Sequence, residues 1–292
     1  MGRIELAARS YRFVSCGSIT FQPLRSGNRP HSPGPYYSQG YRPARAARKV
    51  PERSPCISNN RMPLSIPIMR RLASSENPDS LANKLRTRRF QRFEALVATL
   101  PRPLRILDVG GENAFWENRG WAGRTDVQIF SLNRAPEKQC HENVIPLTCD
   151  ATNLAQFEDG SFDVAFSNSV IEHLFTPENQ CRMASEMQRV GKAFWVQTPN
   201  FWFPMEPHFH VPGWQWMPAE LRVSILRRRR CGWRGPCPDE TKARELVSEL
   251  RLLTGGDLRK MFPGASLIPE RFCGLVKSWT VIGGFPAQAG DN

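Results

Sequence analysis

The chain has 292 residues and a formal net charge of +13, with 40 Lys and Arg residues against 27 Asp and Glu. This length fits one large domain or two small ones. The sequence holds no secretory signal and no run of roughly 18 apolar residues, the minimum for a membrane span, so we exclude an integral membrane protein and expect a cytoplasmic one, with organellar targeting left open.

The leader, residues 1–75, carries most of the charge excess. It holds 13 basic side chains against two acidic ones, is rich in Pro, Ser and Gly, and lacks an apolar period. Such a segment buries too little apolar surface to offset its ordering entropy, so we predict that it is disordered. Its composition fits an organellar transit peptide or an electrostatic nucleic-acid tail. Met62 and Met69 offer later start sites that would leave most of it untranslated.

The rest of the chain, residues 76–288, reads as alternating helices and strands. Apolar residues recur every three or four positions from Leu81 to Leu100, which predicts a helix, and Pro101 and Pro103 end it. Near-continuous apolar runs then indicate a parallel sheet covered by helices on both faces. The predicted strands are 105–109, 127–132, 144–147, 162–168 and 193–198; the predicted helices are 177–190, 241–253 and 256–261; a terminal hairpin pairs 266–271 with 277–282.

The first predicted strand ends in a glycine turn, where Asp108 precedes Gly110 and Gly111 and a helix is predicted next. Glycine lets the backbone turn sharply and approach a ligand, and the N–H groups at a helix start bind polar ligand atoms. The full G-x-G-x-x-G pattern is absent. However, ligands of open α/β sheets lie at the carboxyl ends of the strands, and further predicted strands also end in polar residues. These are Asn133, Asp150, Ser167 and Asn168.

Over about residues 80–285 these motifs resemble the class I S-adenosylmethionine (SAM)-dependent methyltransferases of the type 11 group. The resemblance implies an α/β fold with a Rossmann-like, doubly wound sheet of seven strands, the last antiparallel. It also implies a methyltransferase whose glycine turn binds the methionine part of SAM, with Asn133 at the ribose and Asp150 at the adenine. The family usually has Asp or Glu in place of Asn133, which accepts with only one oxygen. The implied cofactor-binding residues are Asp108, Gly110, Gly111, Asn133, Asp150, Ala151, Ser167 and Asn168.

The segment after the fifth predicted strand, residues 199–240, is an insert rich in proline, aromatic residues and histidine. Its prolines oppose a regular helix or strand between positions 204 and 218, and related enzymes build the acceptor pocket here. Methyl transfer to a hydroxyl needs positioning and a base; Glu206, His208 and His173 are the candidate catalytic residues. The aromatic side chains fit a lid, and Glu172 with His173 could instead cap the following helix.

We expect a small-molecule or glycan-type acceptor that is methylated at oxygen. Nucleobase methylation is disfavoured because the fourth strand ends in Ser-Asn-Ser-Val, without the Asn/Asp-Pro-Pro-aromatic tetrad of amino-methylating nucleic-acid enzymes. A divalent ion between the pair Glu172–His173 and the histidines of the insert, His208 and His210, has acceptable ligand types. Adjacent side chains usually diverge, so we expect no metal.

Two further interpretations stay open. The run Arg227–Arg230 closes an amphipathic stretch and is either a solvated face or a contact for an anionic acceptor or a membrane surface. The alternative in a different class is a non-catalytic SAM-fold module that binds a partner or nucleic acid through its basic segments. The oligomeric state is open as well.

Overall fold

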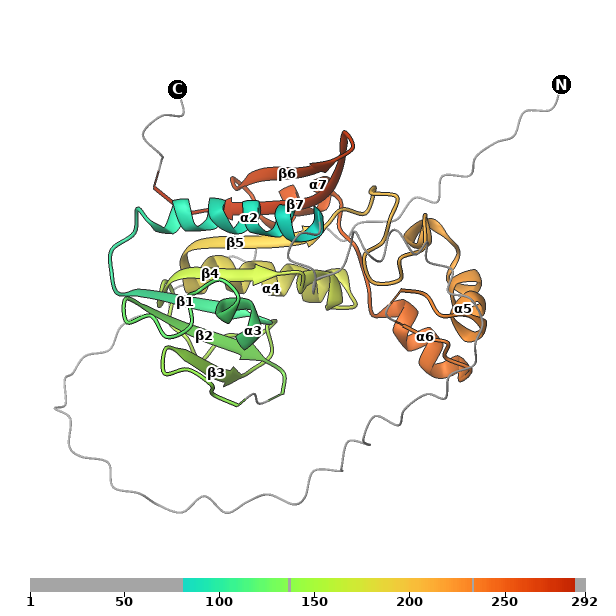
Figure 1. Ribbon diagram of the computed structural model, residues 1–292, viewed down its shortest axis with the longest axis horizontal. Coiled ribbons are helices and arrows are strands. Elements are labelled where there is room, and N and C mark those ends of the chain that lie inside the picture. Colours follow the sequence, from blue (N-terminus) through green and yellow to red (C-terminus); the bar gives the residue numbers. More distant parts are fainter. Residues whose placement is uncertain (1–80, 136–137, 233, 287–292) are drawn as a thin grey trace, which may run out of the picture. The chain divides into compact units, whose positions relative to one another are not determined.

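The computed structural model describes residues 81–135, 138–232 and 234–286, so the predicted leader lies outside the described residues. The described chain forms a seven-stranded sheet in the order β3-β2-β1-β4-β5-β7-β6 (Figure 1). Strands β1 to β5 are parallel, and β7 runs antiparallel to both of its neighbours. The predicted Rossmann-like fold is therefore confirmed. The strands are β1 (Leu104–Val109), β2 (Val127–Asn133), β3 (Val144–Thr148), β4 (Phe162–Asn168), β5 (Gly191–Pro199), β6 (Ser266–Phe272) and β7 (Leu275–Gly283).

Several helices begin at side-chain caps that the sequence supplies. The hydroxyl of Thr176 accepts a hydrogen bond from the N–H of Asn179, with Pro177 in the first turn of α4. The expectation that Glu172 and His173 cap this helix is wrong, because they lie in a separate 3₁₀ turn before it. The helices are α2 (Leu81–Val97), α3 (Asn113–Glu117), η1 (Ile171–His173), α4 (Pro177–Val190), η2 (Trp214–Trp216), α5 (Ala219–Arg228), α6 (Glu240–Ser248) and α7 (Gly255–Met261).

Two apolar clusters lie on opposite faces of the sheet, because successive side chains of a strand point to opposite sides. On one face Phe93 and Val97 of α2 cluster with Leu104 and Ile106 of β1. On the other face the next β1 residues, Leu107 and Val109, cluster with the buried methionines of α4. Figure 1 shows α2 and α4 on the two sides of the strands. This packing fixes the carboxyl ends of the parallel strands as one rigid edge.

The insert packs around an apolar cluster of its own. Phe209, Trp214 and Leu226 are buried there together with Ala243 and Val247 of α6, so α6 joins the insert even though it begins at the predicted boundary of 240. As predicted, residues 204–218 contain neither an α-helix nor a strand of the sheet. Figure 1 shows α5 and α6 beyond the ends toward which the parallel strands point. A separate small core therefore faces the edge where the site is expected.

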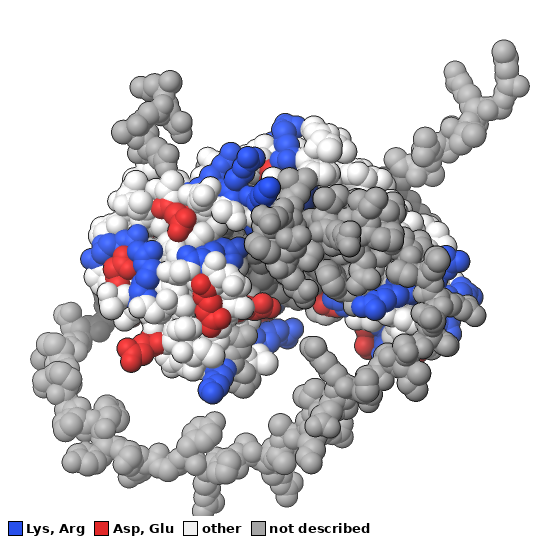
Figure 2. Space-filling model, viewed as in Figure 1, with Lys and Arg blue, Asp and Glu red and all other residues white. Residues whose placement is uncertain are grey.

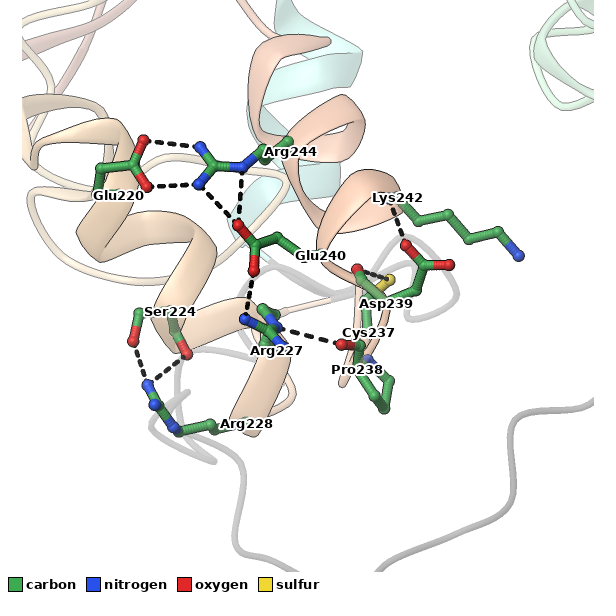
Figure 3. A network of polar contacts seen from close by, with 10 residues as sticks. All are labelled: Glu220, Ser224, Arg227, Arg228, Cys237, Pro238, Asp239, Glu240, Lys242 and Arg244. Atoms are coloured by element: carbon green, nitrogen blue, oxygen red, sulfur yellow. Dashed lines mark hydrogen bonds and ion pairs between the residues drawn. The ribbon is translucent and has the colours of Figure 1, made fainter.

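Ion pairs join the two helices of the insert. The Arg244 guanidinium lies 2.7 Å from Glu220 of α5 and 2.8 Å from Glu240 of α6, and Arg227 lies 2.8 Å from Glu240 (Figure 3). Arg228 bonds to Ser224 within α5. The first two arginines of the 227–230 run therefore contact the insert itself.

Candidate active site

The glycine turn is built around a buried carboxylate. Asp108 is 2% exposed and accepts a hydrogen bond from Trp116 Nε1 at 2.6 Å. Gly110 has φ +76°, and a Cβ there would lie 2.4 Å from Val170. A Cβ on Gly111 would lie 2.0 Å from the Asp108 carboxylate. An added Cβ is therefore poorly accommodated at both positions, and at Gly111 the atom that it would meet is the buried Asp108 carboxylate.

The end of β2 is bonded directly to this turn. Asn133 Nδ2 donates to the carbonyl oxygen of Gly111 at 2.6 Å, and the Ser131 hydroxyl donates to the same oxygen at 3.0 Å. Since the amide nitrogen of Asn133 is used here, its Oδ1 is the atom that can accept a bond from a ribose hydroxyl. The structure thus brings the predicted ribose residue to the glycine turn.

The residues after β3 form a tight polar turn. Asp150 Oδ1 accepts bonds from the backbone N–H and the hydroxyl of Thr152, at 2.9 and 2.8 Å. These two bonds, more than the charge of Arg134 at 3.7 Å, hold the pKa of Asp150 below its usual range. Ala151 is buried against the apolar cluster under the turn. Thr152 therefore holds Oδ1, while Oδ2 faces the exposed Arg134 guanidinium at 3.7 Å.

The two predicted cofactor residues at the end of β4 differ in their surroundings. The Ser167 hydroxyl is fully buried and donates to the carbonyl of Val109 at 3.2 Å, so it joins β4 to β1. Asn168, one residue later, lines an open pocket. Of this pair, Asn168 is the residue that lines a surface pocket, while Ser167 is fully buried.

We expect Asn133→Ala and Asp150→Ala each to weaken SAM binding by about 1–3 kcal/mol, because each removes a hydrogen-bonding group from a polar site. Titration calorimetry measures this, with Asp159→Ala as the control, since Asp159 is an exposed carboxylate that pairs with Arg189. Unchanged affinity in both folded site variants would contradict the assignment.

Glu172 lies at the junction of β4, β5 and the insert. It is fully buried; Oε2 accepts a bond from the Thr198 hydroxyl of β5 at 2.9 Å, while Oε1 has no hydrogen-bond partner. Its backbone carbonyl accepts from Arg251 N–H at 2.8 Å, which holds η1 in place. Burial raises the pKa of Glu172 to about 7. A buried carboxyl with a free oxygen is costly unless something else binds it.

The insert contributes a carboxylate–imidazole pair. Glu206 is 1% exposed; its Oε1 lies 2.5 Å from His208 Nδ1, and its Oε2 accepts from the backbone N–H groups of His208 and Phe209. Burial disfavours the charged imidazole, but the bond and the charge of Glu206 outweigh burial and raise the pKa of His208. The pair fixes the ring and leaves Nε2 as its free nitrogen.

The third candidate, His173, faces the same space. Its Nδ1 lies 3.3 Å from Glu249, which in turn pairs with Arg234 at 2.6 Å. The rings of His173 and His208 meet edge to face with centroids 4.8 Å apart. Burial lowers the pKa of His173, and the charge of His208 adds to that shift. The three predicted catalytic residues therefore lie together, and Glu172 lies among them.

We call Glu172, His173 and His208 the His–Glu cluster. One ligand-type atom from each lies within 4.8 Å of the others. The expectation that the adjacent side chains of residues 172 and 173 diverge is wrong, because the 3₁₀ turn η1 presents both toward the insert. His210, the fourth residue of the metal alternative, lies outside this group.

Sequence reasoning missed an arginine pocket, lined by Arg86, Arg89 and Arg119 together with aromatic side chains and Asn168. The pocket has about 230 Å³ of empty space, counting solvent at its mouth. Burial and the charges of Arg89 and Arg86 lower the pKa of Arg119 to about 10. Glu270 lies 3.9 Å from Arg89. Figure 2 shows Lys and Arg side chains gathered over α2. The signal available in the sequence was the spacing of Arg86 and Arg89 by one helical turn.

The matched part of the chain covers the middle of the sheet. Residues 124–193 match a family model described as a methyltransferase domain. Two uncharacterized proteins of Mycobacterium tuberculosis, from strains CDC 1551 / Oshkosh and ATCC 25618 / H37Rv, are each 38% identical to this chain over 68 residues, which are 23% of this chain and 22% of each relative. The match thus spans about a fifth of the length of these curated relatives.

The chain carries a methyltransferase domain. Together with the sheet order, this match confirms the predicted class I SAM-dependent methyltransferase domain and implies SAM as its cofactor. The matched range contains Asn133, Asp150, Glu172 and His173; the glycine turn and His208 lie outside it.

Solved structures of SAM-dependent methyltransferases are similar to this methyltransferase domain. One from Aquifex aeolicus is 13% identical with a TM-score of 0.38 and covers 66% of this chain and 87% of that one. One from Methanosarcina mazei is also 13% identical with a TM-score of 0.38 and covers 64% and 94%. Among the described residues of the domain, no helix has the length and apolar character that a bilayer span requires. The six described cysteines form no disulfide with one another.

Proposed function

We propose that this protein transfers the methyl group of SAM to an oxygen atom of a small-molecule or glycan-type acceptor. The observation that carries the proposal is the 2.5 Å contact between Glu206 Oε1 and His208 Nδ1, which is partly buried and lies next to Glu172. A carboxylate that orients an imidazole is the arrangement of a general base. His208 lies next to Glu172, which is bonded to Thr198 of β5.

The proposed cofactor site fits the groups that SAM presents. The glycine turn offers close backbone approach, and the N-cap of α3, Glu112, makes no side-chain capping bond, which leaves N–H groups of the first turn for a ligand. Asn133 Oδ1 can bind a ribose hydroxyl, and Asp150 with the backbone of Ala151 can bind the adenine. Register pairs the end of β1 with that of β2 and β4, so these groups share one edge.

SAM supplies a methyl group on a positively charged sulfur, ready for in-line displacement. Within this chain, His208 Nε2 accepts the proton of the acceptor hydroxyl when no other ligand occupies that nitrogen. Glu206 stabilises the resulting imidazolium through Nδ1, and His173 helps to orient the acceptor. Proton removal by a positioned base contributes about 10²–10⁴-fold to rate.

The arginine pocket supports an acceptor or cofactor group that carries negative charge. Arg86, Arg89 and Arg119 lie around one pocket, and the described carboxylate that pairs with them at the ion-pair distance is Glu270. Guanidinium groups match carboxylates and phosphates bidentately. The carboxylate of SAM and an anionic acceptor group are both suited to this pocket.

The test is transfer of labelled methyl from SAM into fractionated cell extract, followed by kinetics on the labelled acceptor. We expect Glu206→Gln and His208→Asn to lower the turnover number about 100-fold or more while SAM affinity stays near the wild-type value. His141→Asn is the matched control, because His141 also pairs with a carboxylate, Glu117 at 2.8 Å, but on the surface.

Each outcome has a definite meaning. If both site variants keep the wild-type turnover number, the pair is not catalytic. If the protein binds SAM but labels nothing in any fraction, the non-catalytic module is favoured instead, and binding of nucleic acid with a steep salt dependence would identify its partner.

A further inference from the structure

The His–Glu cluster holds two imidazoles and one carboxylate in a single small space. One ligand-type atom each from Glu172, His173 and His208 lies within 4.8 Å of the other two. Side chains from two separate segments, η1 and the insert, create this space, and Arg251 N–H and Thr198 each hold Glu172 in place. The convergence is therefore set by tertiary packing and not by one flexible loop.

Glu172 supplies an independent observation. Its side chain is 0% exposed, and Oε1 lacks a hydrogen-bond partner although Oε2 has one in Thr198. A buried oxygen of this kind costs free energy unless a donor or a cation binds it. Each of the two imidazoles has a nitrogen atom within 4.8 Å of the carboxylate. A cation bound between them would pair with the buried carboxylate and with both nitrogen atoms.

The Nδ1 atom of each histidine ring faces a carboxylate outside the cluster. His208 Nδ1 faces Glu206 at 2.5 Å, and His173 Nδ1 faces Glu249 at 3.3 Å. Glu249 is itself fixed by Arg234. Metal-binding histidines usually donate one ring N–H to a carboxylate, which orients the ring and makes the other nitrogen a better ligand. Here both Nε2 atoms are left for an ion.

We infer that Glu172 Oε1, His173 Nε2 and His208 Nε2 bind a divalent transition-metal ion. Two histidines and one carboxylate are a donor set for Zn²⁺ and for Fe²⁺ or Co²⁺. Three protein ligands leave coordination positions open, and the inference rests on the proposed function in placing the acceptor hydroxyl at one of them.

The bound ion changes how the hydroxyl loses its proton. Coordination lowers the pKa of the hydroxyl, so its proton leaves to water. The oxygen lone pair then forms the O–CH₃ bond, the S–CH₃ bond breaks, and its electron pair stays on sulfur. In this state His208 is a ligand, and Glu206 is a positioning residue that orients its ring.

The experiment uses the full-length protein, stripped with a chelator and titrated with Co²⁺ alone. We expect one Co²⁺ per chain, visible absorption typical of few-coordinate Co²⁺, and displacement by Zn²⁺. Glu172→Gln and His208→Asn should each weaken Co²⁺ binding at least about tenfold, and Glu206→Gln should weaken it about 10- to 100-fold although it removes no ligand. His141→Asn, the surface His–Glu pair, should bind as wild type.

Two results would overturn the inference. One is that the wild-type protein binds no Co²⁺; the other is that folded Glu172→Gln and His208→Asn both bind Co²⁺ with the wild-type affinity. Circular dichroism checks folding, and His173→Asn replaces Glu172→Gln if that buried variant fails to fold, because His173 is more exposed. Calorimetry with SAM and labelled-methyl transfer are run in parallel. Methyl transfer without Co²⁺ binding rejects the metal site alone, whereas Co²⁺ binding without SAM binding rejects the proposed function and leaves the metal site intact.

Discussion

Phe93→Ala is expected to lower the free energy of unfolding by about 3–5 kcal/mol, the usual cost of truncating a buried aromatic residue. Phe93 is 0% exposed. Its ring lies 4.9 Å from that of Phe166 in β4, 5.6 Å from Trp195 in β5 and 5.8 Å from Trp121, centroid to centroid. One side chain thus attaches α2 to the sheet, and its removal leaves a cavity among rigid rings.

Denaturant-induced unfolding of the protein measures this change. Leu221→Ala is the control, because Leu221 is 48% exposed on α5. A loss below about 1 kcal/mol for Phe93→Ala would mean that α2 does not pack as the structure has it. The variant should also weaken anion binding in the arginine pocket, since α2 carries both Arg86 and Arg89.

The sheet was largely predictable because its signal is local. Apolar runs such as Phe162–Asn168 are buried on both faces, so each run is visible without its neighbours. The predicted bounds of β4 and α4 match those of the structure, and β1, β2 and β5 differ by one or two residues at their ends. The antiparallel hairpin of β6 and β7 was also predicted, and in the structure Cys273 and Gly274 between the two strands both have positive φ.

The His–Glu cluster was only partly predictable because tertiary contacts create it. The sequence identified His173, Glu206 and His208 by residue type, but not that η1 would turn Glu172 and His173 toward the insert. A helix cap was the alternative role for these two residues, and Thr176 provides that cap. Side-chain direction in a short 3₁₀ turn depends on what packs over it, and here that is the insert.

The arginine pocket could not be predicted from the charge pattern of the sequence. Arginines in a helix such as α2 usually face solvent. The spacing of Arg86 and Arg89 by one helical turn does not single them out, because Arg88 and Arg92 are also about one turn apart. The structure separates them by burial: Arg89 packs against the sheet near Glu270. Conversely, the 227–230 run that drew attention in the sequence contacts α6 through Arg227. The charge pattern alone did not identify which arginines form a site.

Gly111→Ala is expected to weaken SAM binding at least about tenfold, or about 1.4 kcal/mol. The added Cβ would lie 2.0 Å from Asp108 Oδ2. Asp108 cannot move aside, because it is buried and bonded to Trp116, which is itself fully buried. The turn must therefore shift, and the carbonyl of Gly111, which Asn133 and Ser131 bind, shifts with it.

The matched control for this substitution is Gly256→Ala. Neither Gly111 nor Gly256 has positive φ, so the two changes differ in what the new methyl group meets: for Gly256 it is only Thr254 Oγ1 at 3.5 Å. Alanine within α7 should leave SAM affinity unchanged and stabilise the helix by about 0.5–1 kcal/mol. Titration calorimetry measures the SAM affinity of both folded variants. Wild-type SAM affinity in Gly111→Ala would mean that the cofactor does not rest on this turn, because the turn cannot accept the methyl group and keep its shape.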